Sequence, residues 1–355
     1  MIIKGKRDFR TLLLWWNLHQ NSRQMPWKGE KNPYLIWLSE IILQQTRVEQ
    51  GLPYFLRFKQ NYPTVKHLAI AKPDEVMKLW QGLGYYSRAR NLHETAQHIH
   101  TALHGKFPTT FEEIKKLKGV GDYTASAFAS FAFGEKKAVV DGNVIRVLAR
   151  VFGVDTAFDT TAGKKQFAEL AQELIDEEQP GAYNQAIMDF GAMVCTPQNP
   201  KCEDCVFNKM CVAYKQDLID VLPVRSKKNK ISSRYFTYLL IRNKKEILIE
   251  KREAKDIWQN LYQLPLIETD KPVKRNFSEL ISGLLGNKKY AIKTYSKEIT
   301  QMLSHRKIHF RFVEIEADDL SKLHVKGSQK IKLKDLQKFA FPRTINLYLR
   351  ENSLL

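Results

Sequence analysis

The sequence lacks any apolar run that approaches the roughly 20 residues a membrane-spanning helix needs. Its N-terminal segment also lacks the small-residue cleavage site of a secretory signal. We therefore expect a soluble, cytoplasmic protein with no membrane partner. Acidic residues are scarce beside basic ones, 38 against 57, which gives a formal net charge of +19. Such a surface favours nucleic acid as a partner, although a ribosomal or membrane-surface protein could carry the same charge.

Cysteine is also rare, and all four cysteines lie between positions 195 and 211. This cluster is too local to staple a large fold, so it indicates a metal site in a reducing compartment. Cys195, Cys202, Cys205 and Cys211 form the spacing C-x6-C-x2-C-x5-C, in which four thiolates can converge on one centre. The spacing alone leaves a zinc site and a [4Fe–4S] cluster equally open.

The 355 residues suit two domains. Apolar residues recur at helical spacing over residues 1–220, which predicts a mainly helical domain. Residues 221–234 contain a basic stretch without periodicity and are interpreted as a linker. Residues 235–355 predict an α+β domain, with strands at 235–241, 246–251 and 308–315 and helices at 276–285 and 333–339.

Two glycines, Gly119 and Gly121, lie in the segment LKGVGDYT between two helical patterns. Glycines permit backbone conformations closed to other residues, and the N-terminus of the following helix can receive a phosphate. A lone Gly-x-Gly is most often an ordinary connection between helices. In a basic protein this segment matches a helix-hairpin-helix motif.

Two carboxyls are candidates for acid–base chemistry. Glu40 interrupts a helical pattern that is apolar on nearly all sides, and Gln44 lies one turn further on the same face. A carboxyl in such surroundings has a raised pKa and can donate a proton near neutrality, unless a buried Arg or Lys pairs with it. Asp141 precedes Gly142 at the start of another helical pattern, where a helix N-cap is the simpler interpretation. An acid and a second carboxylate together suit cleavage of a glycosidic bond.

Five segments occur in order and together resemble the MutY adenine glycosylases of the endonuclease III, or helix-hairpin-helix, superfamily: WLSEIILQQT (37–46), GLGYYSRARNL (82–92), LKGVGDYTASA (117–127), VVDGNVIRVLAR (139–150) and NQAIMDFGAMVC (184–195). The resemblance covers nearly all of the helical domain. It implies a [4Fe–4S] cluster on the four cysteines. It also implies that Glu40 protonates adenine and that Asp141 stabilises the oxocarbenium-like sugar, with Tyr123 assisting near Asn143.

The same resemblance assigns further residues to DNA. It implies that Gln44 and Tyr85 wedge into the duplex beside the target pair, with Leu83 in the same DNA-contacting segment. Arg23 and Gln185 are expected to touch the extruded adenine. Tyr123 stands where bifunctional relatives have a lysine that forms a Schiff base with the sugar, so base release without efficient strand cleavage is expected.

The second domain resembles the MutY C-terminal domain, a relative of Nudix folds, from Lys251 onward through WQNLYQLP (258–265). The metal box Arg-Glu-x-x-Glu-Glu of hydrolysing Nudix proteins is absent from the sequence, so binding is expected in place of hydrolysis. Ser304 and His305 are the expected readers of 8-oxoguanine, while Leu303 replaces the aromatic residue usual in the family.

The sequence therefore predicts a monomeric, monofunctional DNA glycosylase that excises adenine opposite 8-oxoguanine or guanine in duplex DNA, in base excision repair. Two alternatives remain open. A bifunctional glycosylase/lyase for oxidised pyrimidines would normally need a lysine at Tyr123. A non-catalytic lesion sensor would have no use for Glu40 and Asp141.

Overall fold

The computed structural model describes residues 2–226, 231–273, 277–286, 289–303, 306–323 and 325–355. The chain forms two compact units, the first of Met1–Ile70 and Asn91–Lys227 and the second of Ala71–Arg90 and Lys228–Leu355. The units are not contiguous in sequence, because Ala71–Arg90 packs with the second. The domain limits expected from the sequence, 1–220 and 235–355 about a linker at 221–234, remain a prediction.

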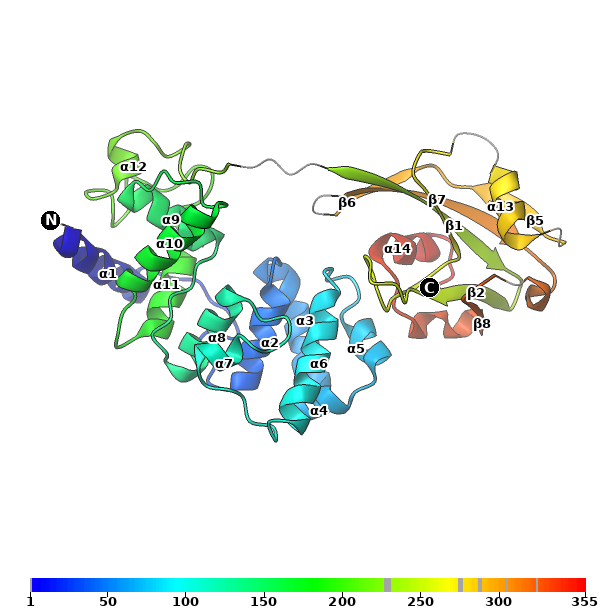
Figure 1. Ribbon diagram of the computed structural model, residues 1–355, viewed down its shortest axis with the longest axis horizontal. Helices are drawn as coiled ribbons and strands as arrows, with labels where there is room; N and C mark the ends of the chain where they lie inside the picture. The colour runs from blue at the N-terminus through cyan, green and yellow to red at the C-terminus, as the bar shows by residue number, and fades with distance from the viewer. Residues whose placement is uncertain (1, 227–230, 274–276, 287–288, 304–305, 324) are drawn as a thin grey trace. The chain divides into compact units, whose positions relative to one another are not determined.

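The first part of the chain is helical (Figure 1). Its helices are α1 (Ile2–His19), α2 (Pro33–Leu43), α3 (Val48–Asn61), α4 (Val65–Ile70), α5 (Pro73–Leu79), α6 (Ser87–Thr101), α7 (Phe111–Ile114), α8 (Asp122–Phe133), α9 (Gly142–Phe152), α10 (Thr161–Leu174), α11 (Pro180–Met193) and α12 (Val212–Lys215). None of the described helices is both long and apolar enough to cross a membrane.

Local signals fix where the helices of the site begin and end. Helix α2 starts at Pro33, whose fixed φ suits the first turn, and the Asn32 side chain accepts a hydrogen bond from the backbone N–H of Tyr34. Helices α8 and α9 end at Gly134 and Gly153, which adopt φ values of +68° and +70°. Such left-handed caps satisfy the last carbonyls and stop each helix at a fixed point.

The core of the first unit gathers around α9 and α11, which pack against each other, and α11 also packs against α1 and α8. Phe9 and Trp16 of α1 meet Phe190 of α11 and Phe207, and the rings of Phe9 and Phe207 stack 4.5 Å apart. Burial of these large rings adds to the hydrophobic stabilisation of this core. The result is a rigid support for the starts of α8 and α9.

The second unit contains a mixed sheet of eight strands in the order β3-β2-β1-β7-β5, with β4 on β1, β6 on β7 and β8 on β2. Its elements are β1 (Ser232–Arg242), β2 (Glu246–Lys251), β3 (Tyr262–Gln263), β4 (Leu266–Thr269), α13 (Phe277–Leu285), β5 (Ala291–Tyr295), β6 (Ile299–Leu303), β7 (Arg306–Glu316), η1 (Leu320–Lys322), β8 (Ser328–Lys332), η2 (Leu333–Lys338) and α14 (Arg343–Glu351). Strands β1 and β7 run parallel over eleven residue pairs, and the other ladders are antiparallel.

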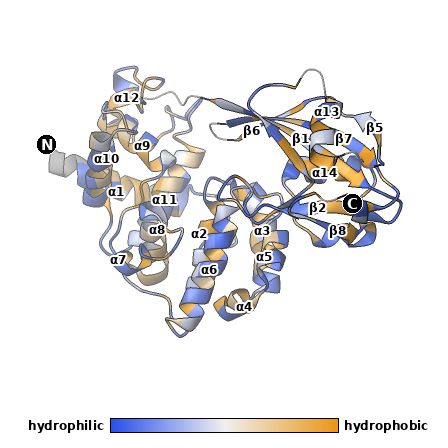
Figure 2. Cartoon of the chain, turned by 45° about the vertical axis from the view of Figure 1, so that its right-hand side comes forward, coloured by the Kyte–Doolittle hydropathy of each residue, from blue (hydrophilic) through white to orange (hydrophobic). Residues whose placement is uncertain are grey.

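The central strands of this sheet are covered on both faces. Alternate residues of β1 and β7, such as Tyr238 and Phe310, pack with α14 and η2 on one face. The residues between them, such as Leu239 and Val313, pack with α13 and η1 on the other. Burial on two sides explains the run of apolar residues at 239–241 in β1 (Figure 2). Strand β7 instead alternates apolar and polar residues over most of its length.

The predicted fold class, a mainly helical first part and an α+β second part, is confirmed. The strand at 246–251 matches β2, and the other two predicted strands match β1 and β7 within three residues. The helix predicted at 333–339 is instead the 3-10 helix η2. Within this unit, Asp74 of α5 accepts hydrogen bonds from Lys251 Nζ at 2.7 Å and from the Tyr262 hydroxyl at 3.0 Å.

Candidate active site

Glu40 lies in the third turn of α2 and is only 6% exposed. Burial disfavours its charged form and raises its pKa to about 7. A hydrogen bond with Tyr123 acts in the opposite direction, and the negative charge of Asp141 adds to the increase. Near neutral pH a large share of this carboxyl is therefore protonated and able to act as an acid.

Tyr123 stands in the first turn of α8, within hydrogen-bonding reach of Glu40. Its hydroxyl also lies 3.4 Å from Met188 Sδ, as a donor. Burial and the charges of Glu40 and Asp141 hold its pKa well above the usual value. Tyr123 is therefore a neutral phenol that connects Glu40 of α2 to Met188 of α11.

Asp141 is the N-cap of α9, as the simpler sequence interpretation held. Its Oδ1 accepts a hydrogen bond from the backbone N–H of Val144 at 2.8 Å, and its Oδ2 accepts one from Asn143 Nδ2 at 2.9 Å. Burial raises the pKa of Asp141, while these hydrogen bonds and the positive charge of Arg146 oppose the increase. Arg146 donates to Asn143 Oδ1 at 2.8 Å and so holds the amide in place. The structure thus gathers Glu40, Tyr123, Asp141 and Asn143 in one site.

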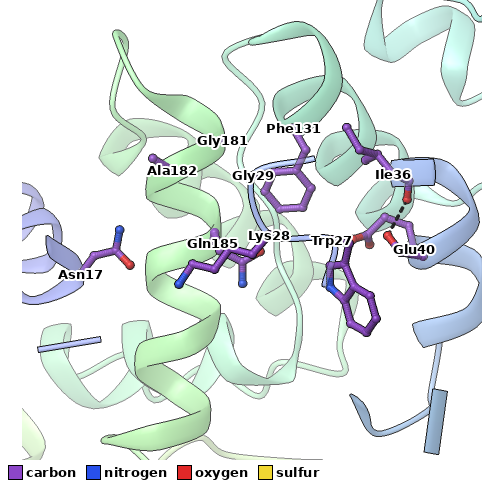
Figure 3. Close-up of a pocket in the computed structure, with 11 residues that line it drawn as sticks. Asn17, Trp27, Lys28, Gly29, Ile36, Glu40, Phe131, Gly181, Ala182 and Gln185 are labelled. Carbon is purple, nitrogen blue, oxygen red and sulfur yellow. Dashed lines mark hydrogen bonds between the residues drawn. The ribbon is translucent and has the colours of Figure 1, made fainter. Parts of the chain in front are cut away.

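Glu40 also lines a pocket of about 300 Å³. Figure 3 shows Glu40 projecting from α2 and Gln185 from α11 into the space between these helices. Trp27 and Phe131 contribute aromatic walls, and Lys28 contributes a cation. Aromatic walls with a few polar groups suit a flat heteroaromatic ligand.

Arg23 and Gln185, expected at the extruded base, both bind the buried carboxylate of Asp189. Arg23 Nη1 and Gln185 Nε2 each donate to Asp189 Oδ1 at 2.9 Å. Gln185 lines the pocket, whereas Arg23 is not among its lining residues. Sequence reasoning missed Asp189, Lys28 and Trp27. An aspartate four residues after Gln185 in an otherwise apolar helix was the available signal.

The glycine hairpin has the geometry that its glycines require. Gly119 has a φ of +79°, and a Cβ atom there would lie 2.7 Å from Asn91 Cβ, so no larger residue fits. Gly121 is the N-cap of α8. Gln44, the expected wedge, instead directs its amide to this hairpin, where Nε2 donates to Thr124 Oγ1 at 2.9 Å. The next residue, Gln45, has a φ of +54°.

The second expected wedge lies in a turn with three positive φ values, at Gly82, Gly84 and Tyr85. Tyr85 is 48% exposed, whereas Leu83 is buried. The assignment of Leu83 and Tyr85 to DNA contact stays a prediction. Ser304 and His305 lie outside the described residues. Leu303, which precedes them, ends β6 and packs partly buried on the sheet core.

The four cysteines line one cavity. Arg150 organises the surrounding loop, because its guanidinium donates to the carbonyls of Thr196 and Pro197 at 2.7 and 3.2 Å and lies 3.6 Å from Cys195 Sγ. Burial raises the pKa of the Cys205 and Cys211 thiols, so their thiolates need a bound cation. Among the described residues, no three His, Cys, Asp or Glu side chains converge on a single metal ion. Four cysteines around one cavity suit either a [4Fe–4S] cluster or a four-cysteine zinc site.

Three family models match the chain. Residues 38–177 match the HhH-GPD superfamily of base excision DNA repair proteins, residues 195–211 the iron-sulfur binding domain of endonuclease III, and residues 237–351 the NUDIX domain. The cysteine loop is therefore a [4Fe–4S]-binding loop of the endonuclease III type, and the predicted cofactor is confirmed.

Among similar proteins, the adenine DNA glycosylase of Buchnera aphidicola from Acyrthosiphon pisum is 32% identical over 349 residues, 97% of each chain. That from Schizaphis graminum is 36% identical, over 74% of this chain and 75% of that protein. The human adenine DNA glycosylase is 44% identical over 59% of this chain and 40% of its own length.

Solved structures agree on the fold of the first part. A thermostable thymine-DNA glycosylase superposes with a TM-score of 0.57 at 30% identity, over 61% of this chain and 99% of that one. A trapped endonuclease III–DNA covalent intermediate gives 0.52 at 22% identity, over 60% and 98%.

Proposed function

Because this chain belongs to the adenine DNA glycosylase family, hydrolytic DNA N-glycosylases of base excision repair, we propose that it removes adenine paired with 8-oxoguanine, and less readily with guanine, in duplex DNA. One observation carries the proposal. Glu40, with a pKa raised to about 7, faces a base-sized pocket beside Tyr123 and Asp141.

Glu40 is the proposed acid. Its proton passes to a ring nitrogen of the extruded adenine, and the bond between that base and C1′ then breaks with the electron pair leaving on adenine. The sugar is left with oxocarbenium character, which the carboxylate of Asp141 stabilises. Water adds to C1′ and its released proton returns to a carboxylate of the site. The products are free adenine and an abasic sugar.

Release of base without strand cleavage follows from position 123. A Schiff base requires an amine within reach of C1′, and a phenol cannot form one. Tyr123 instead keeps Glu40 and Asp141 in register through its hydrogen bond and its packing on Met188. We therefore propose a monofunctional enzyme.

Gly119, Gly121 and the start of α8 are the proposed contact with a DNA phosphate. Tyr85 is the proposed wedge, since it is exposed and strained. For the second wedge we propose Gln44 or its neighbour Gln45, with a preference for Gln45, because the Gln44 amide is engaged by the hairpin. Gln185 and Arg23 are the proposed adenine contacts, and Ser304 and His305 the proposed 8-oxoguanine contacts.

In this proposal the [4Fe–4S] cluster would be held by the four cysteines and would supply structure by tying the loop 195–211 together. Arg146 and Arg150 hold that loop against α9, the helix that Asp141 caps. We propose a monomer that acts on chromosomal DNA in the cytoplasm.

The test compares duplexes that carry A:8-oxoguanine, A:G, A:T and an oxidised pyrimidine, followed by alkali to reveal abasic sites. We expect release from the first, weaker release from the second and none from the others. An Asp141→Asn variant with full activity would sink the assignment. Borohydride trapping of a DNA adduct would favour the lyase alternative, and tight mispair binding without release at enzyme excess would favour a sensor.

A further inference from the structure

Asp189 is fully buried, and the proposed chemistry does not use it. Four donors converge on its carboxylate. Arg23 and Gln185 donate to Oδ1, each at 2.9 Å, while Asn21 and Lys28 donate to Oδ2 at 3.0 and 3.3 Å. All four groups donate, so both oxygens of Asp189 act as acceptors.

An acceptor at this point dictates how the Gln185 amide is oriented. The amide nitrogen must face Asp189, and the carbonyl oxygen is the group left for a ligand. This assignment follows from chemistry, because the opposite orientation would set two oxygens against each other. Gln185 lines the base pocket (Figure 3). The pocket therefore offers an acceptor on this wall.

The same constraint reaches a second pocket residue. Asn21 uses its amide nitrogen for Asp189 and also for Asn17 Oδ1, at 2.7 Å, while its own oxygen accepts from the Arg23 backbone N–H at 3.0 Å. Asn17 Oδ1 is thereby engaged, so the Asn17 amide nitrogen, a donor, is the group left at the pocket. One buried carboxylate thus fixes an acceptor at Gln185 and a donor at Asn17.

We propose that Asp189 is a positioning residue that sets the hydrogen-bonding polarity of the pocket, so that the enzyme selects a base with an exocyclic amino group and rejects one with a keto group at the same position. This inference rests on the proposed function. Adenine has an amino group at C6, whereas hypoxanthine has a keto oxygen there, which would meet the Gln185 oxygen as a second acceptor. A purine with neither group would lose the hydrogen bond without gaining the repulsion.

The first test uses the unmodified enzyme. Single-turnover base release is measured from duplexes with adenine, unsubstituted purine or hypoxanthine opposite 8-oxoguanine, and each rate is divided by the spontaneous depurination rate of that base. We expect adenine first, purine next and hypoxanthine last, with adenine ahead of hypoxanthine by about 10²-fold or more, as for sites built to bind a donor. Equal rates for purine and hypoxanthine would overturn the inference.

The second test uses Asp189→Asn, which keeps the shape but offers both a donor and an acceptor. The Gln185 amide can then turn, so the adenine-to-hypoxanthine ratio should fall roughly tenfold, the scale of one hydrogen bond. The matched control is Asp176→Asn, which removes one charge from the residues before α11 without touching Gln185. Its side chain keeps an oxygen that can accept the hydrogen bond from the Gln179 backbone N–H. This control should leave the ratio unchanged.

A Gln185→Met background separates positioning from general damage. Without the amide, Asp189→Asn should change the ratio no further, whereas a purely structural role would make the two effects add. Melting temperature and the visible absorbance of the iron–sulfur cluster show that each variant is folded. If the unmodified enzyme releases no adenine, the proposed function fails. If it does but the folded Asp189→Asn variant keeps the ratio, only this inference fails.

Discussion

Glu40 and Asp189 are both buried carboxyls of the first unit, yet their surroundings differ. The groups that shift the pKa of Glu40 besides burial are a phenol and a second carboxyl, Tyr123 and Asp141. Asp189 has two cations, Arg23 and Lys28, within 3.3 Å. Burial without a cation leaves a proton available for transfer, whereas burial with two cations yields a fixed acceptor. Both carboxyls are buried, so the neighbouring charges are what distinguish the proposed proton donor, Glu40, from the hydrogen-bond acceptor, Asp189.

The largest expected effect comes from Glu40→Gln, which removes the proton and keeps the shape. Single-turnover adenine release should fall about 10³-fold, within the range of general acid catalysis. The free energy of unfolding should not fall. Because the folded-state pKa is raised to about 7 from 4.5, the stabilisation from Glu40 is present below pH 4.5 and is lost as pH rises to 7. At pH 8 the variant should therefore be at least as stable as the unmodified enzyme by urea unfolding. Full adenine release by Glu40→Gln would show that Glu40 is not the proton donor.

Asp141→Asn should lower release about 10²-fold, because a neutral amide stabilises developing positive charge less well. Asparagine caps a helix about as well as aspartate, so the melting temperature should stay within a few degrees. Comparison with Asp141→Ala, which loses the cap to Val144, separates the two roles. A large loss of stability in the asparagine variant would mean that capping is its main task.

Asp189→Asn, unlike Glu40→Gln, should lower the free energy of unfolding. It leaves Arg23 and Lys28 without their charge partner, and because both cations are about 30% exposed the cost should be about 1–2 kcal/mol in the free energy of unfolding. Urea unfolding beside Glu40→Gln measures the difference directly. Equal stabilities for Asp189→Asn and Glu40→Gln would contradict the distinction drawn between these two carboxyls.

The smallest expected effect is a shift in the pH profile of adenine release when Tyr123 is replaced by phenylalanine. Release should decline above about pH 7, tenfold per pH unit, as Glu40 loses its proton. The hydrogen bond from Tyr123 lowers the pKa of Glu40, so Tyr123→Phe should move this decline to higher pH by a fraction of a unit. A shift to lower pH would contradict that contact. A single-turnover pH series of both proteins measures it.

The sequence predicted residues whose role is visible in their local pattern. Glu40 broke an apolar helix, and Asp141 preceded Gly-Asn at a helix start, so both were identified before any contact was known. Asp189 was not, because its role depends on Arg23 and Lys28, which lie more than 160 residues away in sequence. Gln44 was assigned to the duplex by family resemblance, and the contact of its amide with the hairpin is one that no local signal encodes.

The fold divides in the same way. Helix limits follow from caps such as Asn32 and Gly153, which act within a few residues. The packing of Ala71–Arg90 with the second unit depends on long-range contacts such as that of Lys78 Nζ with the carbonyl of Phe339, at 3.0 Å. The strands β3 to β6 and β8 were missed because they are short and, where exposed, carry little apolar alternation.

The parallel ladder of β1 and β7 has a mechanical consequence. The second unit's main stretch begins with β1, and tension along the chain at Ser232 would pull that strand lengthwise against β7. The evenly spaced hydrogen bonds of the eleven pairs would then be loaded at the same time, so each adds to the force needed to separate β1 from β7. A two-pair ladder such as β2–β3 would yield at far lower force. The longest ladder of the sheet, β1–β7, is thus the one that would bear a force applied to the chain at Ser232.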